Sequence, residues 1–332
     1  MRPNSSKHMS LIIPIFAILA VILIGQSLFP PDAKAADKVM FRLHWKCSAM
    51  HTPFILAMDK GFYQEEGIDI TIKEGAGSTA TLKLIGAGRE TFGFAGTNVT
   101  VKGVARGVPV IQVMVVEKSK RQGILFPVAK GIKTPQDLIG KTIAGSGSGT
   151  SDIFEAFLAV NNLTLKQVRY LAAGRARLEA VATGKADGTL GLGMDDIVRL
   201  QKMGVEAPQI LLFGDWGIPD VGDGIITHLD TYKKNPDLIR RFVKASLRGI
   251  NHAFMDLEET ADIAVKHFPM AKKDIILTQL RSLRWLFPPP LGWQDPKVVE
   301  AMKDIVARFA GLPEAKDMPL NKFFTNEFLP TL

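Results

Sequence analysis

Residues 44–79 read HWKCSAMHTPFILAMDKGFYQEEGIDITIKEGAGST. The strand-like run 39–43 leads into a polar and aromatic loop, 45–51, which opens a short amphipathic helix. Apolar and polar residues then alternate through 68–72, the period of a half-buried strand, and a glycine-rich loop follows at 75–79. Two loops that leave the carboxyl ends of adjacent strands, each leading into a helix, form a crevice that suits a ligand.

Strand-like and helix-like segments keep alternating as far as residue 192, and this rhythm predicts mostly parallel sheets. The series starts again near residue 142, and its two halves resemble each other. Each half has a Gly/Ser/Thr loop before a helix, at 75–79 and at 145–151. This similarity between the two halves predicts two similar lobes with a ligand cleft between them.

The pattern changes to helices alone after residue 227. A helical region without strands must pack on an existing sheet, so we expect it to return to the first lobe. The predicted fold is α/β with two lobes, each a mostly parallel sheet flanked by helices, and with a helical C-terminal region on the first lobe. The expected ranges are 36–128 for the first part of lobe 1, 129–224 for lobe 2 and 225–332 for the return to lobe 1.

The N-terminus has the features of a secretory signal peptide. Arg2 and Lys7 precede a nearly continuous apolar run, 11–29, and Ala33-Lys34-Ala35 fits a cleavage site. We expect residues 1–35 to be removed on export, although the length of the apolar run leaves an uncleaved membrane anchor as the alternative. Both interpretations place the folded part outside the cytoplasm, in the periplasm.

Composition narrows the class of partner. Lys and Arg number 41 against 33 Asp and Glu, a formal net charge of +8. That charge is spread along the chain without a basic run or interleaved aromatics, so nucleic-acid binding has no support, whereas an anionic ligand is compatible with it. Cys47 is the only cysteine, which excludes an intrachain disulfide.

Three blocks of sequence resemble one known family. Residues 57–70, AMDKGFYQEEGIDI, follow a phrase common in type 2 periplasmic binding proteins of ABC importers, in the nitrate/sulfonate/taurine and thiamine-pyrimidine-precursor group. Residues 131–143 and 235–249 are similar to that family at matching positions. The resemblance implies a monomeric receptor without a cofactor, which binds a small molecule and delivers it to an ABC permease in the inner membrane.

The loop 145–151 is the clearest candidate for holding a polar ligand. Its glycines allow close backbone approach, its hydroxyls donate and accept hydrogen bonds, and the following helix offers unpaired N–H groups. The spacing fits neither a Rossmann fingerprint nor a P-loop. The candidates here are Ser146, Ser148, Gly149 and Thr150, and the alternative is a plain turn with Ser151 as a helix cap.

Trp45 and His51 bracket the first loop. An indole stacks on flat ligands and an imidazole hydrogen-bonds to ring nitrogens or acidic groups, so the pair favours a planar or heterocyclic solute. The alternatives are a packing role for Trp45 and a place near a helix N-terminus for His51. We expect His44 to end its strand and point away, and alternation along the loop disfavours a metal site formed by His44, Cys47 and His51.

Other candidates follow strands or lie in turns. Thr97 and Asn98 end a strand and open a helix, and Arg175 and Arg177, which could complement an anion, are expected on a solvated helix face. Candidates from the second loop are Gly77, Ser78 and Thr79, and those from the turn-rich stretch before the return to lobe 1 are Trp216 and Asp220.

Catalytic signatures are weak. No Gly-x-Ser-x-Gly elbow occurs, and the six histidines have no evident Ser or Cys partner. We therefore expect a binding protein and no enzyme, with an anchored ligand-sensing domain or an enzyme of the same fold acting on a pyrimidine-like substrate as the alternatives. Some cytoplasmic relatives of the pyrimidine-precursor branch make the thiamine pyrimidine from their own histidine and bound pyridoxal phosphate, but the secretory segment argues against that reaction here.

Overall fold

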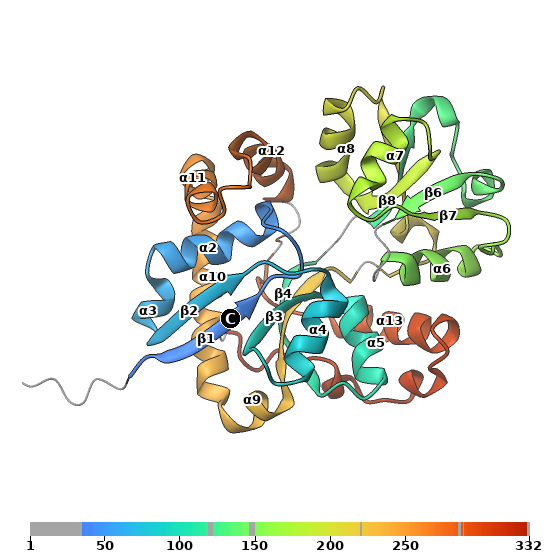
Figure 1. Cartoon of the computed structure of the whole chain (residues 1–332). Helices are drawn as coiled ribbons and strands as arrows, with labels where there is room; N and C mark the ends of the chain where they lie inside the picture. The colour runs from blue at the N-terminus through green and yellow to red at the C-terminus, as the bar shows by residue number, and fades with distance from the viewer. Residues whose placement is uncertain are drawn as a thin grey trace, which may run out of the picture. The chain divides into compact units, whose positions relative to one another are not determined.

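Two five-stranded sheets organise the chain in the computed structural model (Figure 1), which describes residues 35–118, 122–145, 150–219, 221–284, 287 and 289–330. The first sheet has the order β2-β1-β3-β10-β4 and the second the order β7-β6-β8-β5-β9. In each sheet four strands run parallel and one, β10 or β5, runs antiparallel to its neighbours. The two orders correspond strand for strand, so the predicted α/β fold with two similar lobes is confirmed.

The strands of the first sheet are β1 (Asp37–Arg42), β2 (Ile68–Lys73), β3 (Phe92–Gly96), β4 (Val110–Glu117) and β10 (Asp223–His228). Those of the second are β5 (Gln122–Pro127), β6 (Thr142–Gly145), β7 (Arg169–Ala172), β8 (Gly188–Leu192) and β9 (Pro208–Leu212). β2 is an edge strand that buries Ile68 and Ile72 and exposes Asp69 and Thr71, as its alternating sequence predicts. β4 is buried along its whole length because helices cover both faces of the first sheet.

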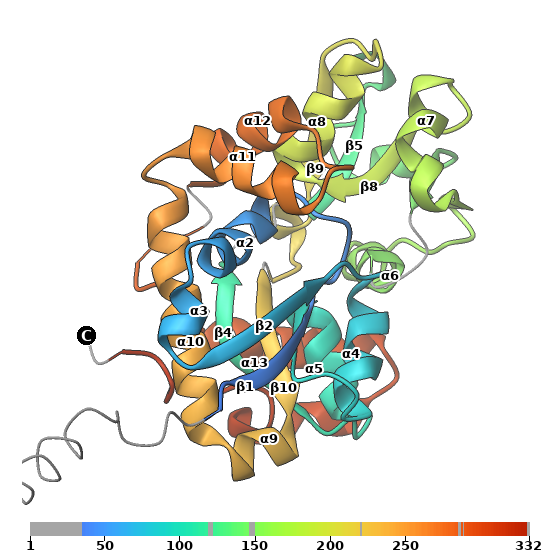
Figure 2. The ribbon, with the colours of Figure 1, turned by 60° about the vertical axis from the view of Figure 1, so that its left-hand side comes forward.

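Helices cover the first sheet on both faces (Figure 2). One face carries α2 (Thr52–Asp59), α3 (Phe62–Glu65), α10 (Pro236–Ala253), α11 (Leu257–His267) and α12 (Lys273–Leu283). The other carries α4 (Ser78–Gly86), α5 (Thr97–Ala105) and α13 (Pro296–Phe309), and α9 (Leu229–Lys234) follows β10. Ile225 and Ile226 are consecutive on β10 and enter the cores on opposite faces, as the two-residue period of a strand requires.

The second sheet carries α6 (Thr150–Val160), α7 (Arg177–Ala182) and α8 (Gly193–Lys202). α13 contacts α5 in the first lobe and also α6 in the second. The helical C-terminal region therefore packs on the first lobe, as expected, and also reaches the second.

The strand β5 lies in a different lobe from the one that its position in the sequence suggested. Residues up to 128 were expected in the first lobe, but β5 pairs with β8 and β9 of the second sheet. The return strand β10 begins at Asp223, close to the expected boundary at 225. β5 is the first strand after the chain crosses into the second lobe, and β10 is the first strand after it returns to the first. Each is the antiparallel strand of its sheet.

None of the helices that the structure describes is long and apolar enough to cross a membrane. Residues 1–34, which hold nearly all of the expected signal segment, lie outside the described ranges.

Candidate functional site

Two loops meet at the carboxyl edge of the first sheet. The Gly77 N–H donates to the His44 carbonyl at 2.6 Å, and the Gly75 N–H donates to the Trp45 carbonyl at 3.2 Å. A Cβ atom at Gly75 would lie 2.0 Å from the Leu43 carbonyl oxygen, so only glycine permits this approach. The loops after β1 and β2 thus form one connected rim, as the sequence predicted, and half-buried Trp45 lies on it.

The first residues of α4 and α5 also lie at this edge. The Ser78 hydroxyl accepts the Gly96 N–H at 3.0 Å, and the buried Thr97 hydroxyl donates to Gln112 Oε1 at 3.0 Å. Both hydroxyls therefore hold the edge together, while Thr79, next in α4, is half-buried and makes no such bond among the described residues. Gly77 precedes α4 with φ of +120°, a conformation that favours glycine.

Two histidine rings lie under the rim. His51 ends η1 (Ala49–His51) and is fully buried, and its Nδ1 accepts the Ser48 N–H at 3.1 Å. Its Nε2 lies 3.1 Å from His44 Nδ1, so in the neutral pair His51 donates and His44 accepts. The remaining proton of His44 is then on Nε2, which lies 3.9 Å from Asp223 Oδ2. The rings form a polar chain from a backbone amide to a buried carboxylate.

The expectation that His44 points away is wrong. Its ring stacks on Phe94, with centroids 4.8 Å apart, and it lies between His51 and Asp223. His51, which we expected at a ligand, has no exposed surface in this conformation, and both of its nitrogens are hydrogen-bonded. Its contact towards the crevice side is the 3.1 Å hydrogen bond to His44.

Two acidic residues that the sequence did not single out complete this edge. Asp223 is the first residue of β10 and pairs in register with Glu117, the last residue of β4. Both side chains are buried. Glu117 ends an apolar strand and Asp223 ends a turn-rich stretch, and pairing between distant segments brings them together.

The buried His51 should make stability depend on pH. Burial, reinforced by the His44 ring, holds the pKa of His51 well below its ordinary value. The unfolded chain takes up a proton near pH 6.5 whereas the folded chain does not, so this contribution to stability is complete above that pH and is lost as the pH falls below it. Between pH 7 and pH 5 we expect the wild type to lose about 2 kcal/mol more of its unfolding free energy than His51→Gln, measured by urea unfolding. Equal losses in the two proteins would contradict this assignment.

The second lobe offers a corresponding edge. β6 ends at Gly145, and α6 begins at Thr150. A helix therefore begins within the predicted Gly/Ser/Thr stretch 145–151, as expected. Predicted residues Ser146, Ser148, Gly149 and Asp220 lie outside the described residues. Ala173, just after β7, donates its N–H to the Gly145 carbonyl at 3.0 Å, so the short helix η4 (Gly174–Ala176) starts at this same edge.

Trp216 does not join this edge. Its carbonyl accepts the Asn161 side-chain amide at 3.0 Å, just beyond the last residue of α6. Thr150, the first residue of this helix, lies at its opposite end, about 16 Å away. Trp216 packs instead against the core of the second lobe.

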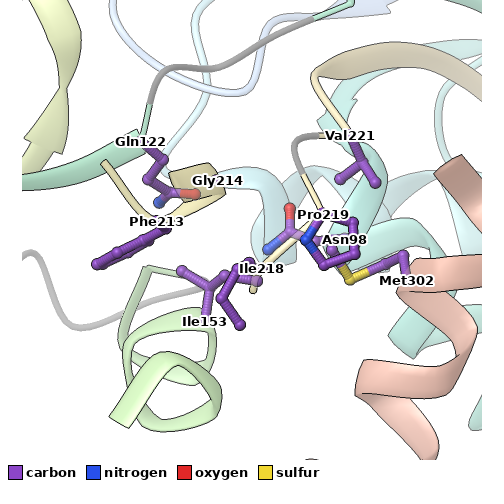
Figure 3. A pocket seen from close by; sticks show the side chains of 9 residues that line it. All are labelled: Asn98, Gln122, Ile153, Phe213, Gly214, Ile218, Pro219, Val221 and Met302. Carbon is purple, nitrogen blue, oxygen red and sulfur yellow. The ribbon is translucent and has the colours of Figure 1, made fainter. Parts of the chain in front are cut away.

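Asn98 faces a small cavity where the two lobes join (Figure 3). The cavity, of about 20 Å³, also touches Gln122 of β5, Phe213 after β9 and Met302 of α13. The Asn98 Oδ1 atom is buried and has no hydrogen-bond partner among the residues that the structure describes. This volume holds one water molecule but no organic ligand, so in this conformation Asn98 lines the junction of the lobes, and its contact with a ligand stays a prediction.

Two further contacts between the lobes involve charged side chains. The Arg175 guanidinium carbon lies 5.9 Å from the centre of the Trp45 ring. Lys202 Nζ of α8 lies 2.5 Å from Asp274 Oδ2 of α12. Arg175, expected only on a solvated face, therefore meets the aromatic residue of the opposite lobe.

The remaining groups considered are metal-ligating side chains and the thiol of Cys47. The described residues contain no group of three or more His, Cys, Asp or Glu side chains that could hold a metal ion. Burial, together with the nearby Glu74 carboxylate, raises the pKa of the Cys47 thiol to about 12. The thiol is therefore protonated at neutral pH and is a poor nucleophile.

The fold matches solved binding proteins. The alkanesulfonate-binding protein SsuA from Xanthomonas axonopodis pv. citri has a TM-score of 0.67 at 17% identity, over 89% of this chain and 100% of that one. The periplasmic nitrate-binding protein NrtA from Synechocystis PCC 6803 has a TM-score of 0.66 at 13% identity, over 88% and 87% of the two chains. The two lobes define a type 2 periplasmic binding protein fold. A family profile described as NMT1/THI5 like matches residues 48–260, and the chain belongs to that family.

Related proteins in this family include binding proteins and enzymes. The riboflavin-binding protein RibY of Chloroflexus aurantiacus is 27% identical over 321 residues, covering 90% of this chain and 88% of the relative. The formylaminopyrimidine-binding protein of Halalkalibacterium halodurans is 22% identical over 307 residues, covering 87% and 90%. The 4-amino-5-hydroxymethyl-2-methylpyrimidine phosphate synthase THI13 of Saccharomyces cerevisiae is 28% identical over 236 residues, covering 67% and 68%. The resemblance inferred from the three sequence blocks is confirmed.

Proposed function

We propose that this protein is an extracytoplasmic receptor that captures a small planar heterocyclic or anionic organic ligand between its lobes and delivers it to an ABC permease. The observation that carries the proposal is the pairing of Trp45 on one lobe with Arg175 on the other, at the carboxyl edges of both sheets. Ligands bind at such edges in open α/β sheets. Binding to both lobes stabilises the closed form, which a permease can recognise.

The named relatives support a flat ligand. RibY and the formylaminopyrimidine-binding protein carry names of heterocyclic ligands and align over most of this chain. The proposed contacts in the first lobe are Trp45 and Thr79, with His51 supporting through His44. Those in the second lobe are the segment 146–150 and Arg175. The signal segment 1–35 and a monomeric state complete the proposal.

An enzyme acting on a pyrimidine-like substrate is the second candidate, because synthases align over about two thirds of the chain. The environment of His51 bears on it. A histidine that serves as a reactant must expose its ring to the other reactants, whereas His51 is buried with both nitrogens bonded.

A ligand screen tests the receptor directly. Thermal shift and calorimetry of the purified protein with riboflavin, pyrimidines, aromatic carboxylates, sulfonates and nitrate should give at least one ligand that is recovered unchanged. Trp45→Ala should weaken binding of a planar ligand at least about fivefold, because stacking on an aromatic ring contributes about 1 kcal/mol or more. Conversion of the ligand, or loss of protein mass at His51, would favour the enzyme. Binding of nitrate alone, unaffected by Trp45→Ala, would sink the stacking role.

A further inference from the structure

Arg175 lies where a second wall of the ligand site would be needed. β6 and β7 pair in parallel with Gly145 opposite Ala172, which brings the end of β7 to the carboxyl edge of the second sheet. The next residues turn sharply, with Gly174 at φ of +57° and the Ala176 N–H bonded to the Ala173 carbonyl at 3.0 Å. This turn presents exposed Arg175 to the indole of Trp45 in the other lobe.

The charge of Arg175 is not committed to a carboxylate. Arg177, two residues later, donates to Asp196 at 2.7 Å, and that ion pair fixes it within the second lobe. Among the residues that the structure describes, Arg175 forms no ion pair, and its recorded contact is with the Trp45 ring. Its guanidinium therefore remains able to meet a ligand.

The spacing of the two side chains is close to that of a stack. A flat ring between the indole and the guanidinium needs about 7 Å, two contacts of roughly 3.5 Å each. The present separation of 5.9 Å is the distance of a weak direct cation–π contact. A small opening of the lobes, about 1 Å, would admit a flat ring and replace one contact by two.

We infer that Arg175 is a specificity-determining residue, which closes over a planar, neutral or anionic heteroaromatic ligand and holds it against Trp45. The inference rests on the proposed receptor function and deepens it by naming the ligand class. A guanidinium plane is attracted to an electron-rich ring face and to an anionic substituent, and it repels a cationic ring. The site therefore selects neutral or anionic flat rings over flexible, non-planar solutes and over cations.

Riboflavin and 2-aminoethanesulfonate are suitable probes, the first planar and the second not. Riboflavin affinity should fall at least fivefold in Arg175→Ala and less in Arg175→Lys, which keeps the charge but loses the plane. Quenching of protein fluorescence by bound riboflavin should fall with it. Lys166→Ala is the matched control, since it removes one exposed positive charge from the same lobe before β7 begins, at the other edge of the sheet, and should bind as the wild type does.

The outcomes separate the inference from the proposed function. If the wild type and Arg175→Ala bind riboflavin equally well, the role of Arg175 is overturned, whereas the proposed receptor function is supported. Wild-type binding of 2-aminoethanesulfonate alone also overturns the planar ligand class and leaves the receptor standing. Binding of no compound in the full screen defeats the receptor, and the inference with it. Thermal unfolding of Arg175→Ala should match the wild type, because the side chain is exposed.

Discussion

Replacing Phe242 by alanine should lower the free energy of unfolding by about 4 kcal/mol, the range found when a buried phenylalanine is truncated. Its ring on α10 is fully buried and stacks on Phe92 of β3 with centroids 3.9 Å apart. It also contacts Phe41 of β1 and Tyr63 of α3, each with centroids 5.4 Å away. One side chain thus joins the returning C-terminal helix to the first sheet, and urea unfolding measures its contribution.

Phe242→Leu is the control for this prediction. Leucine fills most of the space but removes the ring contacts, so we expect less than half of the loss seen with alanine. Similar losses for the two variants would mean that ring geometry rather than volume stabilises the cluster. A loss below 2 kcal/mol with alanine would contradict the central position of the ring, since buried phenylalanines cost about 3–5 kcal/mol.

Local pattern accounts for much of what the sequence predicted correctly. The alternation at 68–72 corresponds to an edge strand, and the helices expected after residue 227 include α10 from Pro236 to Ala253. Both features depend on residues close together in the chain, where the period of apolar side chains reports which face is buried. The loops at 75–79 and 145–150 precede helices for the same reason.

The pairing of segments that are far apart in the chain could not be predicted from local pattern. β5 has the same apolar character whichever sheet it joins, so its pairing with β8 could not be read from residues 122–127. Glu117 and Asp223 meet because β10 returns beside β4. Arg175 meets Trp45 only because the lobes approach each other. The sequence located the rim of the crevice but not the residues that reach it from elsewhere.

The prediction that His44 points away was wrong for a more local reason. Leu43 is fully buried, and strict alternation would send the next side chain to the opposite face. β1 ends at Arg42, however, and alternation no longer governs the loop that follows. His44 can then turn towards Phe94 and His51.

Replacing Gly222 by alanine should lower the free energy of unfolding by about 3 kcal/mol, through a left-handed backbone and a steric clash together. Gly222 has φ of +59°, and a Cβ atom there would lie 1.8 Å from the Glu117 carbonyl oxygen. Its own carbonyl accepts the Thr97 N–H at 3.2 Å. The glycine therefore lets the returning chain close against the ends of β3 and β4, directly before Asp223.

Gly131→Ala isolates the steric part of this effect. Gly131 has φ of +64°, but nothing lies within 4 Å of a Cβ atom built there, so alanine should cost only about 1 kcal/mol. Urea unfolding of both variants gives the difference, which is the penalty for separating Gly222 from Glu117. Equal losses would show that β4 and β10 can part at this point without cost. A larger loss at Gly222 would show that the close approach of these strands stabilises the fold next to the point where Asp223 pairs with Glu117.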